Sequence, residues 1–414
     1  MNKLQFMRSK SFSYKIILNI IVFLLTSFLI LSCNKEKAPT PCENNENTTN
    51  KVIIIGAGAS GLAAAYKLEE EGVDYQILEA SDRIGGRLKK NEGFADFPID
   101  LGAEWIHEDK SILNYITNQS GSEPNVETIL YQPMNVYEVD GNTITQNSEQ
   151  EMIDYYANYI TEYKFKNTTW FDFIYENFAQ YIEQNIVFNA QVETIDYSGD
   201  EVILTTADGF EYRAEKVILT VSPGVLKSNS ITFNPSLPSG KIDAIQSVNF
   251  LPGFKLFLKF SDQFYPDVIS YASNTGEKTI YNIAYGKESN DNVLGLLSTG
   301  ASAEQYYQMG TPEAIVEDVI QELDGFFNGA ASQTYLGAYL YEDWGQNIFT
   351  QGTWTSNFLA ASEALKSSLD EKVYFAGETY NSSGINPVDG FYIIRGSVQS
   401  AVISAFETVE KVLE

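Results

Sequence analysis

The stretch from Lys51 to Arg87 constrains this chain more than any other, because its pattern specifies a nucleotide-binding fold. It opens with Val52 to Ile55, a β-branched apolar run typical of a strand buried on both faces. Three glycines in the order G-x-G-x-x-G follow it: Gly56, Gly58 and Gly61. They permit a tight turn, a close approach of the backbone to a pyrophosphate, and a helix whose N-terminus suits an anion. A second apolar run ends in Glu79, 18 residues after Gly61, where a carboxylate can bind a ribose hydroxyl. The stretch therefore predicts an adenine dinucleotide site.

The next residues indicate which dinucleotide is bound. Arg83-Ile84-Gly85-Gly86-Arg87 adds a second glycine pair between two arginines, just past the acidic strand. A nicotinamide enzyme has no need of this extension, whereas flavin oxidases use it to continue along the pyrophosphate. A glycine-rich turn without a ligand would not explain the strand, the helix and the acidic residue at these distances. We therefore expect FAD rather than NAD.

The chain resembles the flavin-containing amine oxidase family, which includes monoamine oxidases, polyamine oxidases and flavin-dependent histone lysine demethylases. Six blocks carry the resemblance, in the family's order: GAGASGLAAA, LEASDRIGGR, IDLGAEWIH, KVILTVSPGVLK, FKLFLKF and VYFAGE. The resemblance implies an α/β fold in which a Rossmann-type FAD-binding domain is interleaved with an α+β substrate domain. We expect the FAD-binding domain at residues 51–108, 187–238 and 362–414, and the substrate domain at 109–186 and 239–361.

The resemblance also implies the residues of the cofactor site. They are Gly56, Gly58, Ala59, Ser60, Gly61, Glu79, Ala80, Gly86, Arg87, Gly102, Ala103, Glu104, Trp105, Val192, Trp344, Gly377 and Glu378. Mammalian monoamine oxidases attach the flavin to a cysteine, but the matching position here, in QGTW, is Thr353. We therefore expect non-covalent FAD.

Lys255 is the first candidate for catalysis. Alternation in GFKLFLKF places it on one strand face with Phe257 and Lys259, opposite Leu256 and Leu258. Family enzymes carry a lysine here that is hydrogen-bonded through water to flavin N5, which implies that Lys255 positions this water. A solvated strand lysine is the alternative, and Lys259 fits it better.

Aromatic residues and one histidine complete the catalytic candidates. Trp354 follows the position of covalent attachment, where relatives place one wall of an aromatic pair beside the substrate nitrogen. The second wall is either Phe391 or Tyr392. The segment NSSGINPVDGFYIIRG is longer than in relatives, so the alignment does not decide between these two residues. His107 occupies a place where polyamine oxidases line the substrate tunnel. Core packing is the alternative for the tryptophan and the histidine.

The N-terminus indicates export. Four basic residues precede an apolar run from Ile16 to Ser32, as in a signal peptide, and Ile-Leu-Ser-Cys33 resembles the lipobox of bacterial lipoproteins. An uncleaved anchor is the alternative, although 17 residues with Asn19, Thr26 and Ser27 make a marginal span. We expect a signal peptide at 1–32, a lipid on Cys33 and a polar tether at 33–50. The protein would then be anchored to a bacterial membrane, outside the cytoplasm.

Charge and cysteine content exclude several function classes. The net charge is −28, and removal of the predicted signal, with its four basic and no acidic residues, would leave −32. Nucleic acid is therefore excluded as a partner, while cationic amines would be attracted, unless the charge serves solubility alone. The two cysteines, Cys33 and Cys42, precede the fold, and His107 is the only histidine. We expect neither a disulfide in the core nor a metal site.

The remaining pattern suggests where the elements lie. Residues 187–238 read as a strand meander followed by a buried strand, and Val373 to Phe375 as a strand before a final helix from about Gly396. Residues 109–186 are aromatic-rich and mostly helical in pattern. Residues 239–361 begin with long strands and contain an amphipathic helix from Pro312 to Phe327.

These features predict an FAD-dependent oxidoreductase that acts on CH–NH bonds. A monoamine or polyamine would lose a hydride to the flavin, the imine would hydrolyse to an aldehyde, and O2 would be reduced to H2O2. An L-amino acid oxidase or desaturase is one alternative. For the first, Arg395 is the candidate in the C-terminal part of the chain to bind the substrate carboxylate. A flavin-binding surface protein without catalysis is another, against which the retained Lys255 argues.

Overall fold

An eight-stranded sheet is built around β1 (Asn50–Ile55), which lies between two parallel neighbours. The computed structural model describes residues 50–107, 109–117, 126–141, 143–159, 161–271, 277–356, 363–381, 384–385 and 392–414, with the backbone alone at 50, 384–385 and 392–393. Cys33, the predicted signal, the predicted tether up to residue 49 and Phe391 lie outside these residues, as does the side chain of Tyr392. Asn50, expected to end the tether, is the first residue of β1. In sheet order the strands are β10 (Ile186–Val187), β2 (Tyr75–Leu78), β1, β13 (Glu211–Leu219), β12 (Val202–Thr206), β11 (Val192–Asp196) and β14 (Thr232–Asn234), with β20 (Val373–Phe375) paired to β13.

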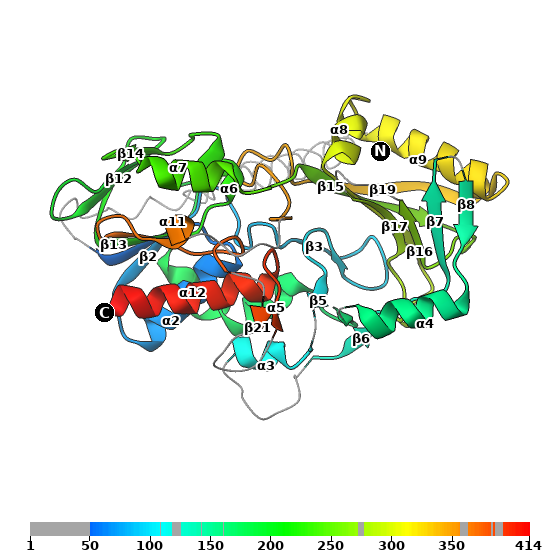
Figure 1. Ribbon diagram of the computed structural model, residues 1–414, viewed down its shortest axis with the longest axis horizontal. Helices are drawn as coiled ribbons and strands as arrows, with labels where there is room; N and C mark the ends of the chain where they lie inside the picture. Colours follow the sequence, from blue (N-terminus) through cyan, green and yellow to red (C-terminus); the bar gives the residue numbers. More distant parts are fainter. Residues whose placement is uncertain are drawn as a thin grey trace, which may run out of the picture. The chain divides into compact units, whose positions relative to one another are not determined.

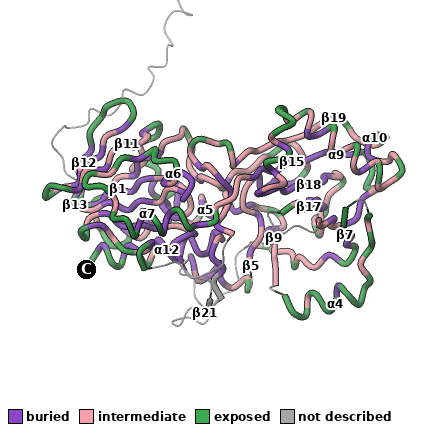
Figure 2. Tube along the Cα trace, turned by 45° about the horizontal axis from the view of Figure 1, so that its top comes forward, coloured by how far each residue is buried: buried purple, intermediate pink, exposed green. Residues whose placement is uncertain are grey.

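The first sheet is buried on both faces, as the apolar run of β1 predicts. Val52 and Ile54 pack into one core with α2 (Ala59–Glu70) and α12 (Val398–Leu413). Ile53 and Ile55 pack into the core on the other face, which includes residues of α6 (Pro223–Lys227), α7 (Ser239–Gln246) and α11 (Glu363–Lys366). Figure 1 shows α12 in red running beside α2, and Figure 2 shows β1 as buried. This arrangement holds the β1–α2 turn rigidly at the carboxyl end of β1.

A second sheet of seven strands lies under a helical layer formed by α8 (Ala301–Tyr307), α9 (Pro312–Phe326) and α10 (Ala330–Thr334). In order its strands are β19 (Tyr335–Asp343), β15 (Gly253–Phe260), β18 (Asn292–Thr299), β17 (Lys278–Asn282), β16 (Val268–Tyr271), β7 (Val136–Asp140) and β8 (Thr143–Gln146). Leu256 and Leu258 of β15 face the helical layer, while Phe257 belongs to the core on the opposite face. The alternation predicted for this strand is therefore confirmed.

A small three-stranded sheet brings distant segments together at the site. β5 (Trp105–His107) pairs with β9 (Glu162–Phe165), which also pairs with β6 (Thr128–Leu130). This pairing sets Trp105 directly opposite Lys164. The short pair β3 (Lys90–Asn91) and β4 (Ile99–Asp100) leads the chain into β5, and β21 (Gly384–Ile385) pairs with β22 (Tyr392–Ile393).

Two predictions about the insertions were wrong in part. Residues 109–186 contain four strands, β6 to β9, besides α3 (Ile112–Ile116), α4 (Glu149–Asn158), α5 (Trp170–Asn177) and two short 3₁₀ helices in the described part. Asp140-Gly141, with Gly141 at φ +58°, turns β7 back onto β8, so the hairpin signal outweighs the aromatic spacing. Residues 239–361 begin with α7 rather than a strand, because Lys241, Ala244 and Ile245 are buried at helical spacing.

The other expected elements are present. The meander is β11 to β13, the late strand is β20, and α9 ends at Phe326 rather than Phe327. The final helix begins at Val398 after Ser397, whose side chain accepts a hydrogen bond from the Ser400 N–H. Within the described residues, no helix combines the length and apolar character needed to cross a bilayer.

Candidate active site

The β1–α2 turn has the geometry of a pyrophosphate site. Gly56 has φ +104°, and a Cβ on Gly61 would lie 1.9 Å from the Gly56 carbonyl oxygen, so larger residues do not fit. At Gly58, in contrast, a Cβ would meet nothing within 4 Å, and this residue lines a large cavity. The N-terminus of the 12-residue helix α2 faces the same space. Backbone N–H groups and the positive end of the helix dipole thus point where phosphates would bind.

Glu79 is held in place at the end of β2. One carboxylate oxygen accepts from Ala57 N at 2.7 Å, and the other accepts from Ser81 N at 2.9 Å and Ser81 Oγ at 2.6 Å. A carboxylate has about four lone-pair sites, so these bonds leave capacity for a ribose hydroxyl. Glu79 and Ala80 both line the cavity.

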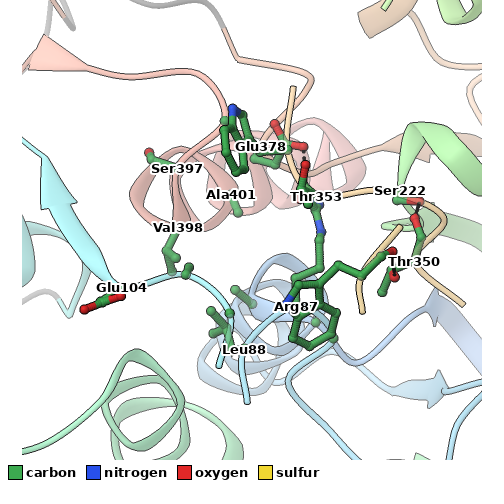
Figure 3. A pocket seen from close by; sticks show the side chains of 18 of the residues that line it. Arg87, Leu88, Glu104, Ser222, Thr350, Thr353, Glu378, Ser397, Val398 and Ala401 are labelled. Atoms are coloured by element: carbon green, nitrogen blue, oxygen red, sulfur yellow. Dashed lines mark hydrogen bonds and ion pairs between the residues drawn. The ribbon is translucent and has the colours of Figure 1, made fainter. Parts of the chain in front are cut away.

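The two arginines of the glycine-rich extension have different tasks. Arg83 donates to the carbonyls of Ile84, Gly86 and Leu88 and so closes its own loop. The Arg87 guanidinium donates to the Thr353 carbonyl and, at 3.2 Å, to Glu378 Oε1. Figure 3 shows Arg87 and Glu378 directed toward one another at the cavity, with Glu104 on a separate loop.

Two buried polar atoms indicate that this part of the cavity receives a polar ligand. Glu378 Oε1 accepts from Arg87, Thr355 and Thr379 at 3.1 to 3.2 Å, but Glu378 Oε2 has no partner in the described part of the chain. Ser60 Oγ, in the first turn of α2, is likewise buried without one. Such atoms are costly unless a ligand or water satisfies them. A dinucleotide along Gly58, Ser60, Glu79 and Glu378 fits this requirement.

The cavity has a volume of about 1270 Å³. Pockets for small molecules commonly occupy roughly 300–1,000 Å³, so this one has room for a dinucleotide and a substrate. It extends from the β1–α2 turn, past Lys255, to the tyrosines of α4. Eighteen of the predicted site residues other than Lys255 line it: Gly56, Gly58, Ala59, Ser60, Glu79, Ala80, Gly86, Arg87, Gly102, Ala103, Glu104, Trp105, His107, Val192, Trp344, Trp354, Gly377 and Glu378. Gly61 is not in the lining, because it packs against the turn behind.

Lys255 lines the cavity and is paired with Glu104. Its Nζ donates to Glu104 Oε2 at 2.8 Å and to the Asp100 carbonyl at 3.4 Å. The residue is 3% exposed, so this is a buried ion pair rather than a solvated lysine. Lys259, further along the same face, instead donates to the Phe94 carbonyl and pairs with Asp291 at 2.8 Å.

A second buried lysine binds the same carboxylate. Lys164 Nζ donates to Glu104 Oε1 at 2.7 Å, and the Tyr281 hydroxyl donates to Glu104 Oε2 at 2.7 Å. Burial alone would raise the pKa of Glu104, but the two ammonium groups outweigh it and hold that pKa well below its usual range. Glu104 is therefore ionised at neutral pH.

The far part of the cavity is aromatic and acidic. Tyr155 of α4 and Tyr159, which follows its last residue, stack with ring centroids 4.2 Å apart, and both line the cavity. His107 Nδ1 lies 2.9 Å from Glu162 Oε1, an arrangement in which a proton on Nδ1 is donated to the carboxylate. Glu138 and Glu277 are further acidic residues of the lining.

The two predicted tryptophans sit differently. Trp344 is buried, donates from Nε1 to the Leu101 carbonyl at 3.0 Å and stacks under the Arg83 guanidinium, 5.8 Å from its ring. It therefore supports the Gly102 turn. Trp354 is partly exposed to the cavity and packs against the core that contains Phe257.

Comparison with known proteins agrees with this geometry. The family described as flavin containing amine oxidoreductase matches residues 59–154 and 142–405. The chain belongs to this flavin-containing amine oxidoreductase family. It is an FAD-dependent oxidoreductase that acts on the CH–NH bonds of amines.

Particular relatives are distant in sequence but similar over most of their length. Polyamine oxidase 4 of Oryza sativa subsp. japonica is 26% identical over 444 residues, which cover 87% of this chain and 89% of the relative. The solved structure of wild-type putrescine oxidase bound to putrescine has a TM-score of 0.68 at 16% identity and covers 88% of this chain and 99% of its own. Cyclohexylamine oxidase from Brevibacterium oxydans IH-35A has a TM-score of 0.68 at 18% identity, with the same coverage. These structures share the fold.

Sequence reasoning missed the partners of Lys255 in this amine oxidoreductase. Lys164 lies in a segment that was expected to be mostly helical, Tyr281 was not singled out, and Glu104 was expected to contribute to a flavin-contacting turn. One signal was available: Lys164 stands between the aromatic residues Tyr163 and Phe165, where a buried charge would require a partner. The sequence does not say which carboxylate that partner is.

Proposed function

We propose that this chain oxidises a diamine or polyamine with O2 as the electron acceptor. The observation that supports this best is the aromatic and acidic part of the cavity beyond Lys255, where Glu138, Glu162 and Glu277 stand among tyrosines. Carboxylates would bind distal ammonium groups of a long cation, and tyrosine faces attract cations. The polyamine oxidases among its relatives support the same substrate class.

The proposed reaction converts one amine carbon. The amine loses a hydride and a proton to become an imine, water hydrolyses the imine to an aldehyde and a free amine, and O2 takes up two electrons and two protons as H2O2. Bound FAD supplies the carrier for this electron pair. Trp354 would form one wall around the reacting nitrogen, and Lys255 would hold a water or O2 close to the reacting atoms. The region around Glu138 and Glu162 would determine how long a substrate the cavity accepts.

An L-amino acid oxidase needs a cation for the substrate carboxylate. Arg395 lines the cavity, but its Nε donates to the Thr379 carbonyl at 2.7 Å. It therefore lies beside Glu378, in the part of the cavity that would hold the cofactor rather than the substrate. The substrate part of the cavity is acidic, so an amino acid's carboxylate would be repelled there. We therefore favour the amine.

A substrate panel tests the proposal. Peroxide release by the FAD-loaded protein is measured with a triamine, a diamine, a monoamine and L-amino acids, with FAD-free protein as blank. We expect kcat/KM to be highest for the triamine or diamine. It should fall as salt rises from about 0.05 to about 0.5 M, because screening weakens attraction between the acidic protein and a polycation. An L-amino acid or a monoamine as the best substrate would contradict the proposal.

Replacing Lys255 with Met tests its role. The variant is expected to bind FAD, while flavin reduction or reoxidation slows by at least about tenfold, ~1.4 kcal/mol in barrier. Lys259→Met is the matched control, because it removes a lysine from the same strand face without touching Glu104. Unchanged rates in both half-reactions of Lys255→Met would remove Lys255 from the mechanism.

We further propose that the protein is a lipoprotein anchored through Cys33 outside the cytoplasm, and that its FAD is non-covalent. The basic and apolar N-terminus and the Cys33 motif support the first proposal. The second is supported by Thr353 at the position that carries the attaching cysteine in monoamine oxidases.

A further inference from the structure

The Glu104 carboxylate joins two lysines that differ in their access to the cavity. Glu104 and Lys255 line the cavity, but Lys164 does not. Exposed fractions of 7% for Glu104, 3% for Lys255 and 2% for Lys164 show that all three are buried. With both lysines protonated the group carries a net charge of +1. Lys164 therefore acts on the cavity through its neighbours, which are its carboxylate partner Glu104 and the rings of Trp105 and Tyr131.

Lys164 is held in an aromatic cage. Its Nζ lies 4.8, 4.2 and 4.6 Å from the ring centroids of Trp105, Tyr131 and Tyr281. Such contacts stabilise an ammonium by electrostatic attraction to the ring faces, more so when water is excluded. The β5–β9 pairing places Lys164 opposite Trp105. The ammonium consequently has one position, with Glu104 Oε1 as its carboxylate partner.

We propose that Lys164 is a positioning residue for Lys255: by occupying one oxygen of Glu104 it leaves Lys255 a single carboxylate oxygen and keeps a net positive charge beside the reacting atoms. Without Lys164, Glu104 could bind the Lys255 ammonium with both oxygens and draw it from the cavity. The group would then be neutral. The inference rests on the proposed role of Lys255 in the oxidation reaction.

The step that would respond most is electron transfer to O2. Negative charge develops on oxygen in this step, and a fixed positive charge in a site that excludes water stabilises it. Removing one unit of charge from the Glu104 group is thus expected to slow reoxidation. The reaction with O2 can be followed without amine, so the protonation of the substrate does not enter.

The charge of Lys164 is sensitive to pH. Burial lowers the pKa of Lys164 to about 8, and the Glu104 charge opposes this shift only in part. Above pH 8 the group therefore tends to neutrality. The titratable and charged groups that surround Lys164 from the neighbouring elements are Glu104, Lys255, Lys287, Tyr131 and Tyr281. Asp100 lies next to this group, near Glu104, Lys255 and Lys287. Burial raises the pKa of both tyrosines well above the usual value, so they stay neutral throughout this range.

The experiment measures the oxygen reaction of the pre-reduced holoprotein from about pH 6.5 to 9.5 in four proteins: wild type, Lys164→Met, Lys164→Arg and the control Lys259→Met. In the wild type the rate is expected to fall as pH rises through about 8. In Lys164→Met it should be about tenfold slower at pH 7 and lack this inflection. Lys164→Arg, whose guanidinium stays charged, should remain fast without the inflection. Lys259→Met should follow the wild type.

A second readout does not depend on activity. In apoprotein carrying ¹³C-labelled lysine, one Cε resonance should titrate near pH 8 in the wild type and be absent from Lys164→Arg. If no such resonance is found, or if Lys164→Met keeps the wild-type rate and pH profile, the inference is overturned. If Lys164→Met does not fold, the inference is still tested by the pH profile of the wild-type rate, by the profile of Lys164→Arg and by the lysine resonance. An unchanged oxygen reaction in Lys255→Met would instead overturn the role of Lys255, and the resonance test of Lys164 would stand apart from that failure.

Discussion

Gly58 and Gly61 stand three residues apart in one turn, yet their side-chain hydrogens face different surroundings. A Cβ on Gly61 would overlap the Gly56 carbonyl oxygen at 1.9 Å, whereas one on Gly58 would enter the open cavity. Gly58 has φ −76°, which alanine adopts without strain. Gly58 therefore leaves room for a ligand, whereas Gly61 leaves room for the backbone of the turn itself.

This difference predicts opposite outcomes for two similar substitutions. Gly61→Ala is expected to lower the free energy of unfolding of the apoprotein by about 2 kcal/mol or more, because backbone must move. Gly58→Ala should leave that stability within about 0.5 kcal/mol but weaken FAD binding at least about tenfold, because the methyl group stands where the pyrophosphate approaches. Chemical unfolding of the apoproteins and flavin titration measure the two effects. Equal behaviour of the two variants would show that the turn is not the pyrophosphate site.

Thr353 determines the expected mode of cofactor attachment. Its hydroxyl donates to the Leu251 carbonyl at 2.8 Å and its own carbonyl accepts from Arg87, so the residue is occupied in holding loops together. Denaturing the yellow holoprotein with acid should release all its FAD into the supernatant. Flavin absorbance that remains in the precipitated chain after washing would refute non-covalent binding.

At the scale of elements, α4 supplies Met152, Tyr155 and Tyr156 to the part of the cavity where we propose that the substrate binds. Figure 2 shows it largely exposed, and Met152 is its one buried residue. Its start depends on a capping box in which Ser148 Oγ accepts from Glu151 N while Glu151 Oε2 accepts from Ser148 N at 2.6 Å. A helix with so little buried surface relies on this cap for its order.

Ser148→Ala is therefore expected to loosen α4 by about 1 kcal/mol and raise KM for the amine, with flavin affinity unchanged. Hydrogen exchange within α4 should accelerate. Thr311→Ala is the matched control, since it removes a similar cap from α9, on the opposite side of the second sheet. If both variants change KM equally, α4 does not shape the substrate site.

For the whole molecule, the proposed lipid anchor on Cys33 would determine where the enzyme binds its cofactor. The basic region contains a single arginine, Arg8, so it lacks the pair of a twin-arginine signal. The chain would cross the membrane unfolded and bind FAD outside the cytoplasm. Cys33→Ser should release the protein from the membrane fraction into the periplasm, still able to bind FAD. Wild-type protein recovered from the cytoplasm with an intact N-terminus would contradict both the lipid anchor and this order of events.

Part of the site follows from local pattern. The strand run, the three glycines, Glu79 and the Gly85-Gly86 pair lie within 37 residues, and their spacing alone places them around one turn. The alternation of β15 likewise placed Lys255 on the face opposite Leu256 before any pairing was known. The helical pattern expected for residues 109–186 was less reliable, because short strands such as β6 and β9 derive their order from neighbours far along the chain.

The sequence by itself thus determined the family, the cofactor and the residues around the β1–α2 turn that line the cavity, since each of these depends on contiguous motifs. Only the tertiary structure decided the net charge of the group formed by Glu104, Lys164 and Lys255. Glu104 meets Lys164 across 60 residues and Lys255 across 151, and no periodicity within one element can specify such pairs. Water would separate these charges in an open chain, whereas the packed sheets exclude it and oblige each buried ammonium to find a carboxylate, a carbonyl or an aromatic face.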